Sequence, residues 1–449
     1  MGQRRYQAEP RDFSPLGKPL DFDFSKKTAQ NRFLKGAMTE RLSSWDPKNL
    51  QARGIPSKNL VNVYRRWGEG EFGVLLTGNI MIEYDHLEAA GNAIIPRGSP
   101  YEGERFEGFK ELAKQSKKHG SLIVAQVSHP GRQVSENIQK YPISASDVQL
   151  EGNIIGSTFA KPRAATEEDI RNIIEGFAHA AEYLEKAGYN GIELHGAHGY
   201  LLAQFLSPST NRRSDKYGGA LENRARLITE IGQEIRRRTS SSFVLGIKLN
   251  SVEFQEQGFT TEDAATLCKL LEDNSFDFVE LSGGTYEDYG EEHRRQSTKK
   301  RKAFFLEFAE KIAPSLSKTR IYVTGGFKTA SAMVDALKAV DGIGLARPAC
   351  LEPKLPKRII NGEVNAAIDQ LTDDNDFIVS TVAAGTQIRQ LGNDQQPIDL
   401  SVEKNLEGFL KDLKKWMKDM AENKDGNEYG FVDIESIASV PYGSAAPSL

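Results

Sequence analysis

Short apolar runs recur along this chain, and helical patterns lie between them. Eight of the runs end in small or polar residues and do not alternate strictly between apolar and polar positions. Such runs are typical of strands that are buried on both faces of a parallel sheet. Eight strands that alternate with helices predict a (β/α)8 TIM barrel, with a doubly wound open sheet as the alternative. The predicted strands cover residues 33–38, 72–78, 121–128, 191–196, 243–249, 276–284, 320–326 and 342–346.

The predicted helices carry signals of their own. Residues 220–238 place apolar side chains on one stripe with a helical period. Residues 166–188 begin with Thr166 and Asp169 in the spacing of a capping box. Two further helices are expected over residues 260–274 and 329–340.

Two segments fall outside this pattern. Residues 129–165 are rich in proline, glycine and serine without a helical period, so we expect them to cap the third strand. The pattern stops near residue 365, which predicts a barrel over residues 1–365 and a largely helical C-terminal extension with a mobile tail over residues 366–449. An apolar stripe in the extension predicts a helix docked on the barrel, in preference to a dimer contact. The stripe consists of Leu406, Phe409, Leu410, Leu413, Trp416, Met417 and Met420.

Composition excludes several classes of protein. The 449 residues carry a net charge of -4 and no basic tract with interleaved aromatic residues, so nucleic acid is not an expected partner. The two cysteines, Cys268 and Cys350, are too few to hold a cysteine-bound iron–sulfur cluster or structural zinc, and no metal is expected. No apolar stretch is long enough to span a membrane, and the N-terminus lacks the apolar segment of a signal peptide. We therefore expect a cytoplasmic protein.

Polar residues at the carboxyl ends of barrel strands face the place where barrels bind ligands. The run 191–196 leads into such a group, with His195 and His198 three positions apart and Tyr200 close behind. These residues suit a metal site that includes Glu193, an acid–base site, or a buried segment in which the histidines only form hydrogen bonds with backbone carbonyl groups. As neutral donors, the two imidazoles could hold one substrate oxygen while the phenol supplies a proton. The other strand-end candidates are Thr39, Gly78, Gln126, Lys248, residues 282–284, Gly325, Gly326 and Arg347.

The ends of the last two strands favour a phosphate site. Gly325 and Gly326 allow backbone N–H groups to approach a ligand closely, and Arg347 supplies a charged bidentate donor. Barrels commonly bind phosphate after these two strands.

A longer motif follows the histidines and is far more specific. It reads HGAHGYLLAQFLSPSTNRRSDKYGGALENR over residues 195–224. The motif strongly resembles the Old Yellow Enzyme family of FMN-dependent NAD(P)H oxidoreductases, in the form with one barrel and no cysteine-bound cluster. Further matches are NRFLKGAMTE, AQVSHPGRQ, KPRAATEEDI, LSGGTYE, VTGGF and GLARPACLEPKLPKRIINGE, so the resemblance covers about residues 15–365.

This resemblance implies an ene-reductase. NAD(P)H would reduce a tightly but non-covalently bound FMN, and flavin N5 would then pass hydride to the C=C bond of an α,β-unsaturated carbonyl compound. His195 and His198 would bind the carbonyl oxygen, and Tyr200 would donate the proton. Thr39 would lie near the flavin C4 carbonyl, and Gln126 at the pyrimidine edge. The residues expected to bind the cofactor are Ala37, Met38, Thr39, Gly78, Gln126, His195, Lys248, Gly325, Gly326, Ala346 and Arg347.

The chain departs from the family pattern at a few positions. Lys248 stands where the family usually has arginine, which keeps a positive charge near the flavin N1–C2 edge but loses the planar fork of donors. Ala37 replaces a common proline, and Thr39 stands where one branch of the family has cysteine. Substrate choice would depend on Tyr286, Tyr289 and the segment 129–165, although the two tyrosines fit the packing of the barrel rim equally well.

Two other functions stay open at this point. One is a metal-dependent barrel hydrolase that uses His195, His198 and Glu193. The other is a flavin-binding protein without turnover that acts through its C-terminal extension. The expected partner is a small enone-type substrate, and the oligomeric state is open, with a homodimer among the alternatives.

Overall fold

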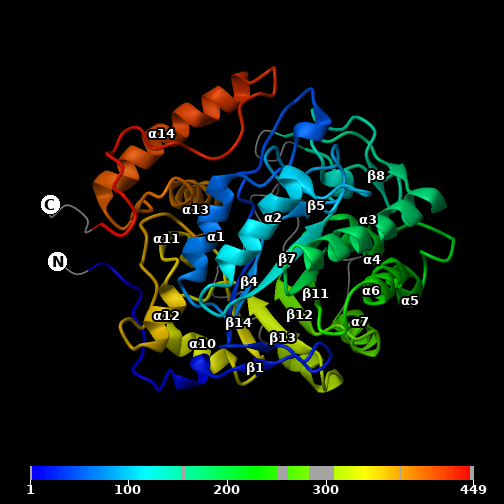
Figure 1. The fold of residues 1–449 in the computed structure, drawn as a ribbon, viewed down its shortest axis with the longest axis horizontal. Coiled ribbons are helices and arrows are strands. Elements are labelled where there is room, and N and C mark those ends of the chain that lie inside the picture. Colours follow the sequence, from blue (N-terminus) through cyan, green and yellow to red (C-terminus); the bar gives the residue numbers. More distant parts are fainter. Residues whose placement is uncertain (1–2, 153–156, 251–260, 283–307, 375, 445–449) are drawn as a thin grey trace.

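Eight parallel strands form a closed barrel at the centre of the computed structural model, which describes residues 3–152, 157–250, 261–282, 308–374 and 376–444 (Figure 1). The strands follow the order β10-β11-β12-β13-β14-β3-β4-β7, and β7 pairs with β10 to close the ring. Each predicted strand lies in this ring, so the predicted (β/α)8 barrel is confirmed. The bounds are β3 Phe33–Lys35, β4 Val74–Leu76, β7 Leu122–Ser128, β10 Gly191–Gly196, β11 Val244–Asn250, β12 Phe278–Ser282, β13 Arg320–Thr324 and β14 Gly342–Leu345.

Helices pack around the outside of the ring (Figure 1). The capping box predicted at Thr166 and Asp169 is present at the start of α3. The helix predicted over residues 220–238 is interrupted at Ala225, where ψ is -10° and therefore closer to a 3-10 turn than to an α-helix. The bounds are α1 Lys58–Gly68, α2 Gly103–Ser116, α3 Glu167–Lys186, α4 Leu201–Leu206, α5 Leu221–Arg224, α6 Arg226–Arg238, α7 Thr261–Asp273, α10 Ala330–Ala336, α11 Arg347–Leu351 and α12 Leu355–Ile360.

Short elements lie outside the ring. In the segment 129–165, β8 pairs with β9, and both the start of the segment and β8 contact α4. Gln204 of α4 donates from Nε2 to the carbonyl oxygen of Pro130 at 3.0 Å and accepts from Ser144 Oγ at 2.8 Å. The remaining bounds are β1 Leu20–Asp21, β2 Thr28–Ala29, β5 Ile80–Met81, β6 Ala93–Ile94, β8 Ile143–Ser144, β9 Arg163–Ala164, and the 3-10 turns η1 Ser14–Gly17, η2 Leu50–Ala52, η3 Gly131–Gln133 and η4 Ala313–Ser315.

The barrel interior changes from apolar to polar toward the carboxyl ends of the strands. One buried apolar cluster fills the barrel near the amino ends of its strands and includes Leu34, Val74, Leu76, Val124, Val244, Phe278 and Tyr322. Further along the strands the buried side chains are Gln126, Glu193, Lys248, Glu280 and Thr324. Alternate residues of a strand share one face, so this polar layer lies above the apolar cluster on the inside of the barrel.

The C-terminal extension contains helices α13 (Phe377–Gly392) and α14 (Glu403–Glu422). Helix α13 lies beside α1, and its Ile388 and Leu391 belong to the main hydrophobic core (Figure 1). Helix α14 buries Phe409 and Leu413 in a separate cluster with residues of α13 and the segments that flank α14. The predicted stripe therefore docks on the extension rather than on the barrel, and Leu410 and Met417 of the stripe are 43% and 51% exposed. Within the described ranges, no helix has the length and apolar character needed to cross a membrane.

Candidate active site

His195, His198 and Tyr200 come together at the carboxyl end of β10. His195 Nε2 lies 3.2 Å from His198 Nδ1, and the His195 ring centroid lies 4.4 Å from that of Tyr200. The turn that makes this possible places His198 at φ 57°, a left-handed conformation that non-glycine residues seldom adopt, and Gly199 follows at φ 75°. The backbone N–H of His198 donates to Asn250 Oδ1 at 3.0 Å, which fixes the turn on the neighbouring strand β11.

Three polar side chains contact the outer nitrogens of the two imidazoles. His195 Nδ1 lies 3.1 Å from Asn79 Oδ1 and 3.3 Å from Ser128 Oγ. His198 Nε2 lies 3.1 Å from Ser282 Oγ. These contacts at the outer nitrogens orient both rings, so that the inner nitrogens, His195 Nε2 and His198 Nδ1, face each other.

Both imidazoles are neutral at ordinary pH. Burial, with the neighbouring His198 and the charge of Lys248, holds the pKa of His195 well below its usual value. Burial and the charge of Lys248 lower the pKa of His198 to about 3. A neutral imidazole donates through one nitrogen and accepts through the other, so each ring can present one N–H to a ligand.

The polar layer of the barrel lies directly below. Gln126 Nε2 donates to Glu193 Oε1 at 2.7 Å, and these residues are register partners on β7 and β10. Lys248 Nζ donates to Glu280 Oε1 at 2.9 Å, again between register partners, and the Thr324 hydroxyl donates to the same oxygen. The positive charge predicted at Lys248 is thus present but paired with a carboxylate that the sequence pattern had not singled out.

The two buried carboxyl groups of this layer differ in protonation. Burial and the negative charge of Glu280 raise the pKa of Glu193 well above its usual value. Burial opposes ionisation of Glu280 as well, but the charge of Lys248 and the hydrogen bonds of Glu280 with Glu193, Thr324 and Lys248 together outweigh it and lower the pKa of Glu280. Of the two carboxyl groups, Glu193 is therefore the one that favours the proton and Glu280 the one that favours the negative charge.

The first-strand residues predicted to line a flavin follow β3. The Thr39 hydroxyl donates to Glu88 at 3.0 Å, and Met38 contacts Cys350 through their sulfur atoms at 3.5 Å. Gly78 follows β4, and its N–H donates to Glu40 Oε1 at 2.8 Å. A Cβ at Gly78 would meet the Glu40 carboxylate at 2.2 Å, so this glycine is required by packing of the protein itself.

Both cysteines are buried, and burial raises the pKa of each thiol to about 12. They are consequently uncharged, unreactive side chains of the core.

The predicted phosphate residues lie together at the ends of β13 and β14, which are adjacent in the ring. Gly325 and Gly326 have φ values of 153° and 71°, conformations that suit glycine. Ala346 precedes α11 and Arg347 is its first residue. The guanidinium of Arg347 donates to Ser380 Oγ at 2.7 Å, a contact with the C-terminal extension that the sequence did not predict.

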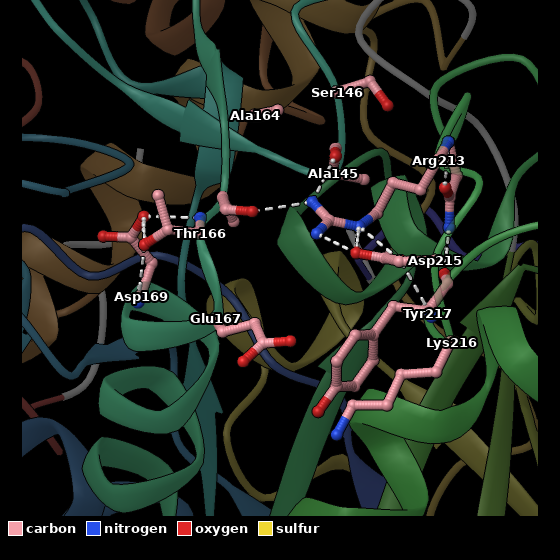
Figure 2. A network of polar contacts seen from close by, with 12 residues as sticks. Ala145, Ser146, Ala164, Thr166, Glu167, Asp169, Arg213, Asp215, Lys216 and Tyr217 are labelled. Carbon is pink, nitrogen blue, oxygen red and sulfur yellow. Dashed lines mark hydrogen bonds and ion pairs between the residues drawn. The ribbon is translucent and has the colours of Figure 1, made fainter.

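Within the rest of the motif, Arg213, Asp215 and Tyr217 form a hydrogen-bonded clamp, that is, a set of bonds that holds two separate segments together (Figure 2). Arg213 donates to the carbonyl oxygens of Ala145 and Ala165 at 3.0 and 2.7 Å, and to Asp215 at 3.0 Å. Asp215 also accepts from the backbone N–H of Tyr217 at 3.0 Å. These bonds tie the loop after α4 to the segment between β8 and α3, so this part of the motif serves the fold.

A different set of residues has the geometry of metal ligands. In the described part of the chain, Glu83, His86 and His129 place ligand atoms within 4.8 Å of one another. The Gly131 N–H donates to His129 Nδ1 at 3.0 Å, so a neutral His129 carries its proton on Nε2 and directs it toward Glu83. Burial opposes protonation of His86, but its contacts with Asp85 and Glu83 raise its pKa to about 9. Protons thus occupy the nitrogens that a metal would need.

The metal trio predicted as an alternative gains no support, since the Glu193 carboxyl bonds Gln126. Sequence reasoning missed Asn79, Asn250 and Glu280 as site residues. Asn250 and Glu280 could have been found, because alternate residues of a strand point to the same side. Asn250 is two residues from Lys248, and Glu280 is two residues from Ser282. Tyr286 and Tyr289, predicted to shape substrate choice, lie outside the described residues.

Comparisons with known proteins agree with this architecture. The family described as "NADH:flavin oxidoreductase / NADH oxidase family" matches residues 15–365. The NADH-dependent flavin oxidoreductase nadA of Aspergillus parasiticus is 51% identical over 409 residues, which cover 91% of this chain and 92% of that protein. A 2-naphthoyl-CoA reductase structure has a TM-score of 0.70 at 25% identity and covers 80% of this chain and 54% of its own.

An old yellow enzyme homologue from Zymomonas mobilis has the same fold, with a TM-score of 0.64 at 21% identity over 78% of this chain and 94% of that chain. The predicted resemblance to the Old Yellow Enzyme family is therefore confirmed, as are its flavin cofactor and its nicotinamide reductant. The chain belongs to the NADH:flavin oxidoreductase / NADH oxidase family and is an FMN-dependent NAD(P)H oxidoreductase.

Proposed function

We propose that this oxidoreductase is an ene-reductase that reduces the C=C bond of α,β-unsaturated carbonyl compounds. The observation that carries the proposal is the meeting of two neutral imidazoles, 3.2 Å apart, with the Tyr200 ring beside His195 at the mouth of the barrel. Two N–H donors that converge on one point suit an oxygen that gains negative charge during the reaction. The adjacent phenol suits the proton transfer that must accompany hydride addition.

For both imidazoles to donate to one substrate oxygen, each histidine must be in a particular tautomer. When the Ser282 hydroxyl donates to His198 Nε2, the proton of that ring is on Nδ1, which faces the site. When the Ser128 hydroxyl donates to His195 Nδ1, the proton is on Nε2, which also faces the site. Asn79 presents its Oδ1 to His195 Nδ1 and by itself favours the proton on Nδ1, so a substrate oxygen that accepts from Nε2 would have to select the tautomer that Ser128 supports. Without a ligand, His198 Nδ1 can donate to His195 Nε2, and a substrate oxygen between the rings would accept from both nitrogens with the two serines as donors behind them.

Tyr200 is placed by the start of α4. It is the N-cap residue of that helix and 5% exposed, so its ring is held beside His195 and away from bulk water. A phenol in this position is protonated and can give its proton to the carbon atom next to the carbonyl group. The helix fixes the donor, and the imidazoles fix the acceptor oxygen.

The residues around the mouth suit FMN. Gly325, Gly326 and Arg347 would hold the phosphate, and Gln126 and Lys248 would hold the polar edge of the ring. Asn250 Nδ2 is a buried donor without a partner among the residues that the structure describes, and it lies on the same strand as Lys248. Bound there, FMN supplies a carrier that accepts hydride from NAD(P)H and returns it to the substrate.

The test is a visible absorption spectrum of the purified protein, followed by anaerobic addition of NADPH or NADH and then of 2-cyclohexenone. We expect a flavin spectrum that bleaches with the nicotinamide and returns with the enone. A flavin spectrum that bleaches but does not return with this or other enones would reject the ene-reductase proposal. It would leave the membership of the family unchanged.

A further inference from the structure

A small charged pocket lies between the ends of β13 and β14 and the C-terminal extension. It is lined by Lys328, Arg347, Pro348, Asp374 and Ser380, among others. Two of these residues, Asp374 and Ser380, lie beyond the part of the chain that matches the family. The pocket adjoins Arg347, the residue proposed to bind the FMN phosphate, and the inference below rests on that proposed role.

Two cations of the pocket share one oxygen atom. Asp374 Oδ1 is 3.1 Å from Lys328 Nζ and 3.9 Å from Arg347 Nη1. All three side chains are largely buried, with exposed fractions of 19% for Lys328, 30% for Arg347 and 27% for Asp374. A phosphate group has three terminal oxygens and nearly two negative charges, so it can contact two cations that are this close together.

The ammonium group of Lys328 is largely buried, and a nearby anion stabilises its charged form. Burial lowers the pKa of its ammonium group, and the charge of Asp374 opposes that shift. Lys328 follows the glycine pair Gly325–Gly326 by two residues, so the same turn that carries the glycines also presents the lysine. The pocket is also lined by Glu352, but that carboxylate pairs with Arg5 and Arg358, so Asp374 is the anion that contacts both Lys328 and Arg347.

Ser380 and Asp374 act on Arg347 in different ways. The short contact of the guanidinium is with Ser380 Oγ, at 2.7 Å, while the carboxylate of Asp374 is more than an ångström farther away. A neutral hydroxyl that accepts from Nη1 orients the guanidinium without reducing its charge. A carboxylate reduces the positive potential that a phosphate would meet.

We propose that Lys328 is a second cation for the FMN phosphate, beside Arg347, and that the C-terminal extension sets the strength of this site. Ser380 is a positioning residue that directs Arg347 toward the phosphate. Asp374 is an internal anion that competes with the phosphate for both cations. The extension thereby belongs to the cofactor site, which gives residues outside the family match a role in holding FMN.

The experiment compares FMN with riboflavin, which lacks the phosphate. Flavin is removed from the full-length protein, and the dissociation constants of both compounds are measured by quenching of flavin fluorescence. Lys328→Gln and Ser380→Ala should weaken FMN binding, by about tenfold for the lysine, whereas Asp374→Asn should tighten it several-fold. Riboflavin binding should stay within about twofold of wild type in every variant. The matched control is Asp433→Asn, an exposed carboxylate of the extension that pairs with Arg389.

Riboflavin binding also shows that each variant is folded, and Lys328→Arg should recover most of the lost FMN affinity. Unchanged ratios of FMN to riboflavin affinity in all variants would overturn the inference and leave the oxidoreductase function intact. Weaker FMN binding by Asp374→Asn would also overturn it, because Asp374 would then support the phosphate rather than compete with it. A wild-type chain that binds both flavins equally would overturn the phosphate site as a whole.

Discussion

At the level of single residues, the two histidines of the site are kept neutral by where they lie. Burial is the main cause of the low pKa of both rings, and the nearby charge of Lys248 acts in the same direction. A neutral ring at every pH in the physiological range keeps one donor toward the substrate oxygen. The affinity of the site for a carbonyl compound should accordingly not follow the titration of an imidazole.

The same low pKa predicts a pH-dependent stability. His198 titrates at about 3 in the folded chain and near 6.5 when exposed, so the unfolded chain binds a proton over this interval that the folded chain does not. The contribution is absent above pH 6.5, and stability falls as the pH drops, by about 3 kcal/mol at pH 4. His198→Asn should remove this part of the fall, as measured by urea unfolding of the holoprotein from pH 4 to 7. The surface variant His119→Asn should not, and equal slopes in the two variants would contradict the assignment.

Tyr200→Phe removes the proposed proton donor and little else. Reoxidation of the enzyme by 2-cyclohexenone should slow by about 100-fold, while bleaching by NADPH stays near the wild-type rate. Stopped-flow absorbance separates the two steps. Equal losses in both steps would show that the hydroxyl supports the site as a whole rather than donating the proton.

Glu280 predicts a change in the redox potential. Reduction adds negative charge to the flavin, and the positive charge of Lys248 favours reduction. The negative charge of Glu280 offsets part of that effect. Glu280→Gln should therefore raise the two-electron midpoint potential of the bound FMN, as measured by dye-coupled spectroscopy. Thr324→Val, which removes another donor to the same oxygen, is the control for altered packing. An unchanged potential in the glutamine variant would place the pair too far from the flavin to act on its charge, and a lower potential would contradict the sign of the effect.

At the level of secondary structure, the eight barrel strands were predictable because both of their faces are buried, so their sequences are mainly apolar and do not alternate strictly between apolar and polar residues. The histidine–tyrosine group was predictable because it follows one of those strands directly. Of the partners behind it, Ser282 was among the predicted strand-end candidates and Asn79 was not, and only the closed ring brings the two side chains to His198 and His195. The break at Ala225 also escaped prediction, because the apolar stripe continues across it.

The clamp formed by Arg213 gives a test at this level. Arg213→Gln should lower the free energy of unfolding by about 2 to 4 kcal/mol, because the buried carbonyl oxygens of Ala145 and Ala165 lose their donor. The neighbouring Arg212 is exposed, so Arg212→Gln should change stability by less than about 0.5 kcal/mol. Chemical denaturation measures both. A loss of activity without a loss of stability in the Arg213 variant would instead indicate a direct role in the reaction.

At the level of the whole molecule, the C-terminal extension is joined to the barrel by polar and apolar contacts. Asn62 of α1 donates to the carbonyl oxygen of Leu391 at 3.0 Å, and Trp45 Nε1 donates to that of Gly426 at 2.7 Å. Ile388 of α13 is fully buried in the same core as α1. We therefore propose that the barrel over residues 1–365 and the extension over residues 366–449 unfold together, although they are separate in the sequence pattern.

Calorimetry can test this cooperativity. Ile388→Ala should lower the midpoint of one shared transition, with a loss of about 2 to 5 kcal/mol. Leu410→Ala, at an exposed position of α14, is the control and should leave the midpoint unchanged. Two separate transitions, with only one of them shifted by Ile388→Ala, would show that the extension is an independent domain.

The burial of Cys268 and Cys350 has a chemical consequence if the enzyme reduces activated alkenes, as proposed. Such compounds are electrophiles, and an accessible thiolate is open to alkylation by them. Here both thiols are enclosed, and burial raises the pKa of each to about 12, so neither offers a thiolate at neutral pH. The fold thus protects the catalyst from its proposed substrates, and prolonged exposure to an enone should leave both cysteines unmodified.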